Sequence, residues 1–444
     1  MPTTQEKAVY SNAWILLLAS LTALGPLSID MYLPALPQMA DDFGVSTQMV
    51  ANSLPAYFLG LAIGQLIYGP VSDRIGRKKP LYFGLSLYII ASLLCVFANS
   101  EWSLIAARVL QALGGCVGVV IARAAIRDRL DMQASAQAFA SMMIVTTIAP
   151  IIAPSLGALV LSFSSWHSIF AFLMVVGLGS LCCVHFFFEE TLDPKRRLKL
   201  NFNQVLNLYG AILQDSSFRR PMFVGCFAGA VLFCYISASA AILMDGYGLS
   251  QQVFAYAFGA NAVGIMLFST LNKRLAQKLS VFQRLKLGSF LQLAGVGLLL
   301  VAGSMTHAPL YIVCAGMFLA VAAIGFTGPN AMAIAMSEQG ARAGTASAIM
   351  GSMQFGCGLL CGVILNFLLW SALLNMAIVM AIFVALALYY VFKLEHEKAY
   401  KLKSGLYKKE THFSVFFYLN ECIKSHSLFK NTAKSSTGTR GVIK

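Results

Sequence analysis

The sequence contains little charge. Only 11% of its 444 residues are Asp, Glu, Lys or Arg, whereas 58% are hydrophobic. An ordinary globular domain is about one quarter charged, so a soluble protein of this length would have too few charges to cover its surface. A disordered chain is excluded as well, because low hydrophobicity is the signature of disorder. The composition therefore predicts an all-α polytopic membrane protein.

Several chemical signatures are also missing. Ten cysteines in 444 residues are too few for a disulfide scaffold, and no C-x-x-C or Cys/His spacing predicts a metal site. There is no G-x-x-x-x-G-K-S/T loop, so ATP does not drive this chain directly. Because no catalytic cluster and no appended soluble domain are visible, we expect neither an enzyme nor a cofactor.

Twelve apolar segments are long enough to cross a bilayer, which requires about 20 residues in helical form. They are residues 13–36, 50–72, 80–99, 104–126, 138–161, 168–188, 222–244, 254–271, 286–304, 309–336, 344–369 and 371–393. The polar segment between the sixth and seventh spans divides them into two sets of six, a common plan of transporters. We expect an N-terminal six-helix bundle, a cytoplasmic central loop, a C-terminal six-helix bundle and a basic, disordered cytoplasmic tail at residues 1–188, 189–221, 222–393 and 394–444.

The basic residues predict the orientation of the chain, because lysine and arginine remain on the cytoplasmic side of a membrane. Thirty of the 32 fall in alternate loops and in the termini, whereas the opposite loops contain acids and no base. Both termini are therefore predicted to be cytoplasmic. The net charge of +14 mostly reports topology, so it is no sign of nucleic acid or of an acidic substrate. The expected partners are membrane lipid and a small-molecule substrate, with no nucleic acid.

Three charged residues lie well inside the predicted spans, away from the span ends: Asp30, Arg108 and Arg123. Counted from the inner ends of their spans, Asp30 and Arg108 lie at nearly the same depth, since each residue adds about 1.5 Å to a helix. Asp30 is the candidate proton carrier, and Arg108 would favour its ionised form when close. The alternative is a fixed ion pair that locks two helices together. Arg123, one turn from the cytoplasmic end, is expected to reach water as an interfacial anchor.

A second pattern follows the second span, where residues 69–79 read GPVSDRIGRKK. This G-x-x-x-D-R-x-G-R-K pattern resembles the signature loop of the major facilitator superfamily. The resemblance implies the major facilitator fold and a latch of the outward-facing state, formed by an acid against the N-terminus of span eleven near residues 342–345. The glycines are expected to allow a tight turn and close helix approach. The candidate latch residues are Gly69, Asp73, Arg74, Gly76, Arg77 and Asp128.

Other motifs narrow the resemblance. Residues 108–114, RVLQALG, are similar to the family's R-x-x-Q-G-x-G, with alanine for the first glycine. Residues 149–157, APIIAPSLG, resemble the kinked G-P-x-x-G-G element of proton-coupled exporters through Pro150, Pro154 and Gly157. Residues 28–37, SIDMYLPALP, resemble the bicyclomycin/chloramphenicol-resistance branch of drug:proton antiporters. That branch implies a multi-pass exporter in a bacterial inner membrane, with Asp30 and Arg108 at the coupling site.

The second half contains no charge away from the ends of its spans, so a substrate site shared by both halves would be apolar, aromatic and amide-rich on that side. Such a site suits lipophilic neutral or cationic compounds. The candidate lining residues are Gln111, Tyr235, Asn261, Asn330 and Gln354. We therefore predict a monomeric, proton-driven efflux pump of drug-like compounds by alternating access. Proton-coupled uptake or export of a small metabolite is the alternative, and the direction of transport separates uptake from efflux.

Overall fold

The computed structural model describes residues 12–130, 132–197, 202–339 and 342–396, and this part of the chain is helical, without a strand. Twelve of its helices are long and apolar enough to cross a membrane, as predicted. They are Ala13–Phe43, Thr47–Ile75, Lys78–Val96, Glu101–Arg129, Gln137–Phe163, His167–Phe187, Ser216–Gly246, Gln251–Leu275, Val281–Ser304, Leu310–Met336, Gly344–Phe367 and Ala372–His396. The expected all-helical fold is confirmed.

Polar residues at the helix starts explain where two of these helices begin. α6 (Glu101–Arg129) starts after Ser100, whose hydroxyl accepts a hydrogen bond from the backbone of Ser103. α12 (Val281–Ser304) starts in the same way after Ser280. In both cases the third helical residue bonds back to the cap, so two free backbone N–H groups are satisfied at each end.

The first span differs from the expected single helix over residues 13–36. It consists of α1 (Asn12–Asp30), the 3-10 turn η1 (Leu33–Ala35) and α2 (Leu36–Phe43). Pro34 and Pro37 lack the backbone N–H that would continue the α-helical hydrogen bonds, which accounts for the break. The break leaves Asp30 at the end of a helix.

The central segment is also more structured than the predicted loop at 189–221. It contains the 3-10 turn η2 (Pro194–Arg196) and α9 (Phe202–Gln214), and α10 (Ser216–Ala240) begins before residue 222. The expected loop was wrong on this point, because the apolar residues of α9 follow a helical spacing. Val205, Tyr209 and Ile212 lie on one face, and the Tyr209 hydroxyl donates to the carbonyl of Leu66 at 2.9 Å.

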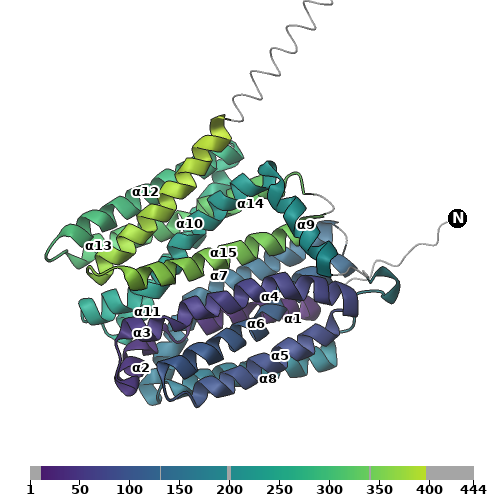
Figure 1. Ribbon diagram of the computed structural model, residues 1–444, viewed down its shortest axis with the longest axis horizontal. Helices are drawn as coiled ribbons and strands as arrows, with labels where there is room; N and C mark the ends of the chain where they lie inside the picture. The colour runs from purple at the N-terminus through teal and green to yellow at the C-terminus, as the bar shows by residue number, and fades with distance from the viewer. Residues whose placement is uncertain (1–11, 131, 198–201, 340–341, 397–444) are drawn as a thin grey trace, which may run out of the picture. The chain divides into compact units, whose positions relative to one another are not determined.

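The helices of the first half pack around α6, as Figure 1 shows in purple and blue. The remaining helices of this half are α3 (Thr47–Ala51), α4 (Ser53–Ile75), α5 (Lys78–Val96), α7 (Met132–Phe163) and α8 (His167–Phe187). α4 and α5 pack against α6, α8 packs against α5, and α7 packs against α1. This packing brings Asp30 on α1 and Arg108 on α6 into one bundle.

The helices of the second half pack in a similar way, with α12 against α13 and α14, and α10 against α14 and α15. Their bounds are η3 (Ala241–Gly246), α11 (Gln251–Leu275), α13 (Leu310–Ala322), α14 (Ile324–Met336) and α15 (Ala343–Phe367). The two halves meet where α15 packs against α4 and where α11 packs against α7 and η1 (Figure 1). The chain therefore has the two-bundle arrangement expected of the major facilitator fold.

The chain divides into a compact unit up to Tyr390 and a second unit, Val391–Lys444. The last helix, Ala372–His396, continues across this limit. The predicted domain limits, 188/189, 221/222 and 393/394, remain predictions. The expected disorder of the tail falls on residues that, beyond His396, lie outside the described part.

Candidate functional site

Asp30 lies at a crossing of helices. Its side chain is 3% exposed, and its Oδ1 has no hydrogen-bond partner in the described part of the chain. α7 crosses α1 directly beside it, because a Cβ on Gly157 would overlap the carbonyl oxygen of Met31. Only glycine allows this approach. Since η1 follows Asp30 and packs against α11, the carboxyl group lies where the two halves meet.

Arg108 is fully buried and is held mainly by aromatic rings. Its guanidinium carbon lies 4.4 Å from the ring centre of Tyr32 and 4.1 Å from that of Tyr57. Its Nη1 donates to Oε1 of Gln111 at 2.6 Å, and Gln111 in turn donates to Ser92 Oγ at 2.8 Å. Nε and Nη2 have no hydrogen-bond partner among the described residues. Cation–π contacts and one hydrogen bond therefore position the charge and leave two donors available.

Asp30 and Arg108 do not form an ion pair within 4.0 Å in the described structure, although the arginine acts electrostatically on the carboxyl group. Both side chains carry unused hydrogen-bonding atoms. A buried polar atom without a partner is costly, so this arrangement is suited to take up a partner in another state. A proton on Asp30, or a shift that brings Arg108 against it, would satisfy the carboxyl group.

Tyr235 and Asn261 place a second polar pair near this point, on the other half of the chain. The Tyr235 hydroxyl accepts a hydrogen bond from Asn261 Nδ2 at 2.8 Å, and its ring stacks on Phe258. The charge of Asp30 acts on the Tyr235 hydroxyl. Tyr235 is therefore electrostatically coupled to Asp30 across the boundary between the halves.

The remaining predicted lining residues do not join this group. Asn330 on α14 donates to Asn272 Oδ1 at 2.9 Å, in a cluster where Arg284 donates to the same oxygen at 2.8 Å. Gln354 on α15 lies against Gly229 of α10. The structure thus distributes the five predicted residues over four places, and their role in lining a substrate site remains a prediction.

The signature loop forms an ion-pair cluster around Arg77. Its guanidinium bonds to Asp73 at 2.5 Å and to Asp128 at 2.8 Å, and it also donates to Ser72 Oγ at 2.7 Å. Burial lowers the pKa of Arg77, but the hydrogen bonds and charges of the two carboxylates outweigh it and raise that pKa. Arg77, Asp73 and Asp128 therefore tie the end of α4 to the end of α6.

Glu190 joins this cluster, although no motif pointed to it. Its carboxylate accepts hydrogen bonds from the backbone N–H groups of Arg77 at 2.8 Å and Lys78 at 3.2 Å, at the start of α5. Gly76 has a φ of +96°, and a Cβ there would overlap Glu190. The signature glycine thus serves both a left-handed turn and the approach of a capping carboxylate.

Two expectations for the loop are corrected or left open. Gly69 was expected to allow a close helix approach, but a Cβ there would meet nothing within 4 Å. Arg74 is exposed. In the described part of the chain Asp73 bonds to Arg77, while the first turn of α15 is approached by Arg127, whose Nη1 would lie 2.6 Å from a Cβ on Gly344. The latch role of these residues remains a prediction.

The proline-rich element lies in α7, which remains one continuous helix from Met132 to Phe163 through Pro150 and Pro154. Its helical neighbour Gly157 makes the close approach to α1 described above. The described residues contain no group of three or more His, Cys, Asp or Glu side chains that could hold a metal ion.

Comparison with known proteins agrees with the fold and the motifs. The sequence profile described as Major Facilitator Superfamily matches residues 18–361. An uncharacterised transporter of this type from Bacillus subtilis, YdgK, is 34% identical, and the alignment covers 80% of this chain and 88% of that protein. A bicyclomycin resistance protein homolog from Haemophilus influenzae is 30% identical over 81% of this chain and 89% of its own length.

The solved structures show the same fold at low sequence identity. The crystal structure of the nucleoside transporter NupG superposes with a TM-score of 0.66 at 13% identity. The superposition covers 86% of this chain and 99% of NupG. At this identity the likeness concerns the fold alone.

Proposed function

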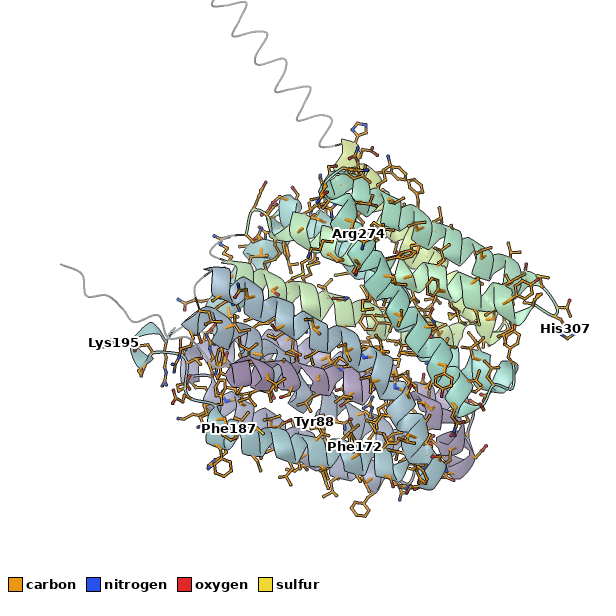
Figure 2. All side chains as sticks on the ribbon, turned by 180° about the vertical axis from the view of Figure 1, so that it is seen from behind. Tyr88, Phe172, Phe187, Lys195, Arg274 and His307 are labelled. Carbon is orange, nitrogen blue, oxygen red and sulfur yellow. The ribbon has the colours of Figure 1, made fainter. Side chains whose placement is uncertain are left out.

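Since this chain belongs to the Major Facilitator Superfamily, and is therefore a multi-pass membrane transporter of small molecules, we propose that it exports drug-like compounds in exchange for protons. Supporting this proposal, one relative at 30% identity carries the name bicyclomycin resistance protein homolog. The proposed direction is outward across a bacterial inner membrane, and the protein acts as a monomer with both termini in the cytoplasm. Figure 2 shows Lys195 of the central segment and His307 of the α12–α13 connection at opposite ends of the helices.

The observation that carries the proposal is the buried, unpaired carboxylate of Asp30 beside an arginine with unused donors. A carboxylate inside a membrane span is costly and is functional by default. In the proposed cycle a proton from outside neutralises Asp30 and favours release of the substrate outward. Loss of the proton inward restores the charge and resets the site. Each pH unit across the membrane supplies about 1.4 kcal/mol per proton for this cycle.

Arg108 sets the two states of the carboxyl group. When Asp30 is ionised, the free Nε and Nη2 donors of Arg108 attract it and draw α1 toward α6. When Asp30 is protonated, this attraction is lost, and Tyr32 and Tyr57 retain the guanidinium. Since α1 also contacts α7 and continues into η1 against α11, movement at Asp30 reaches the boundary between the halves.

The test replaces Asp30 by asparagine, which keeps the size of the side chain and removes its titration. Cells that express the unchanged chain are expected to accumulate less labelled chloramphenicol than cells without it, and a protonophore should abolish the difference. Asp30→Asn is expected to behave like the empty cells, because a neutral amide cannot carry the proton. The amount of protein in the membrane should remain unchanged.

The control is Asp245→Asn, which removes an exposed acid at the end of η3 and should leave efflux intact. Full protonophore-sensitive efflux by Asp30→Asn would overturn the coupling role. A rise in accumulation with the unchanged chain would instead indicate uptake. A panel of further drugs, tested in the same way, defines the range of substrates.

A further inference from the structure

The charges within the predicted spans do not balance. Arg108 acts electrostatically on the carboxyl group of Asp30, although the two do not form an ion pair in the described structure. Among the described residues no acid acts on Arg123, the third charged residue in these spans. Its side chain is partly buried, and its expected role as an anchor that reaches water remains a prediction.

The position of Arg123 on α6 places it toward the second half of the chain. It follows Arg108 by fifteen residues, which at 3.6 residues per turn is about 60° past four full turns, so both lie on one side of α6. Arg127 is one turn further along the same face, and its guanidinium lies against Gly344 in the first turn of α15. The face of α6 that carries Arg123 is therefore directed to the boundary between the two halves, toward its inner end.

Arg123 also lacks a counter-charge there. In the described part of the chain no hydrogen bond or ion pair involves its guanidinium, and the titratable groups that act on it are Cys116 and the like-charged Arg127. Arg127 differs, because Asp73 and Asp128 act on it in addition to Arg77. An arginine without a counter-charge in a low-dielectric setting favours any anion that reaches it and repels cations.

We propose that Arg123 is a binding subsite for the carboxylate or sulfonate group of organic anions that enter from the inner end. This inference rests on the proposed export function and specifies its substrate class. It corrects the expected preference for cations, because a cation would approach Arg123 and Arg127, and no described acid acts on Arg123 to offset the repulsion. Neutral compounds remain possible substrates, and compounds with one negative charge are the preferred ones.

Binding of three dansyl compounds to the purified full-length chain in nanodiscs tests the proposal. Dansylglycine carries one negative charge, dansylamide is neutral, and a dansyl derivative with a trimethylammonium group carries one positive charge. Dansylglycine is expected to bind more tightly than the cation. Arg123→Gln should lower the affinity for dansylglycine at least tenfold, as expected for loss of a charge-assisted hydrogen bond. The affinity for dansylamide should not change.

Two further variants separate a binding role from a structural one. Arg123→Lys keeps the charge and should retain most of the affinity for dansylglycine. Arg274→Gln removes an exposed arginine of the second half (Figure 2) and should change none of the three affinities. Equal weakening of all three probes by Arg123→Gln, or dansylglycine binding no tighter than the cation in the unchanged chain, would overturn the proposal.

These measurements are made without a proton gradient, so their outcome does not depend on Asp30 as a proton carrier. If the binding experiment contradicts the anion subsite while efflux is normal and sensitive to a protonophore, only the subsite proposal is overturned. If the unchanged chain shows no proton-driven efflux but dansylglycine binds as expected, only the proposed proton-coupled export is overturned.

Discussion

At the scale of single residues, Glu190 gives the most direct prediction. Burial raises the pKa of this carboxyl group, but hydrogen bonds from the backbone N–H groups of Arg77, Leu192 and Lys78 outweigh it and lower the pKa. Because the folded-state pKa lies below the unfolded one, the cap stabilises the fold above the unfolded pKa and is lost as the pH falls through the folded pKa. Glu190→Gln should therefore lower stability by about 1 kcal/mol at neutral pH, as expected for a lost helix cap.

Thermal unfolding of the purified protein in detergent measures this effect between pH 7 and pH 3. The difference in unfolding temperature between Glu190→Gln and the unchanged chain should become smaller as the pH falls. Glu189→Gln is the matched control, since Glu189 is exposed and lies 3.8 Å from Arg129. A gap that stays constant with pH would contradict the capping role.

At this scale the sequence predicted the burial of Asp30 because acids inside a span are rare, but it placed Arg284, which is buried in α12, in a loop. A single carboxylate inside a span has to be enclosed, and Asp30 is buried as expected. Arg108 and Gln111 are three residues apart on one helix face, and the structure contains a contact between them at 2.6 Å. The contact of Glu190 with the turn at Gly76 joins residues more than a hundred positions apart, and no local pattern encodes it.

At the scale of helices, the contact of α7 with α1 is the most sensitive to substitution. Gly157→Ala would place a methyl group on the carbonyl oxygen of Met31, a backbone atom that cannot yield as a flexible side chain would. Overpacking of this kind costs about 1–3 kcal/mol, and here it would also displace the end of α1 that carries Asp30. We expect a lower unfolding temperature and loss of efflux. Gly179→Ala in α8, which meets nothing within 4 Å, should leave both unchanged or raise the unfolding temperature.

Helix existence was predictable because a span needs a long apolar segment, whereas helix ends and short surface helices depend on tertiary contacts. All twelve spans were found from apolar length. α9 was missed, since its 13 residues are too few to cross a membrane and its spacing was read as a loop. The structure shows which face of α9 packs on the bundle, because the Tyr209 hydroxyl on that face donates to the carbonyl of Leu66 in α4.

At the scale of the whole transporter, the two halves are joined at both ends of α15. Near its start, Gly344 lies against Arg127 of α6. Near its end, Asn366 Nδ2 donates to Asn52 Oδ1, directly before α4, at 2.6 Å. Transport by alternating access requires the halves to separate at one end and then at the other, so the proposed mechanism requires the contact at the outer end to break.

This requirement is tested by joining Asn52 to Asn366. The variant with both Asn52→Cys and Asn366→Cys is treated with a short bis-methanethiosulfonate reagent, which links two nearby thiols and is reversed by dithiothreitol. Efflux should fall to the level of empty cells after treatment and return after reduction, because the link holds the outer ends of α4 and α15 together. The chain with Asn52→Cys alone, treated in the same way, controls for reaction at the chain's own cysteines and should keep its efflux. Undiminished efflux by protein shown to be cross-linked would mean that these ends stay together throughout the cycle, and the outward opening would then have to occur elsewhere along the boundary between the halves.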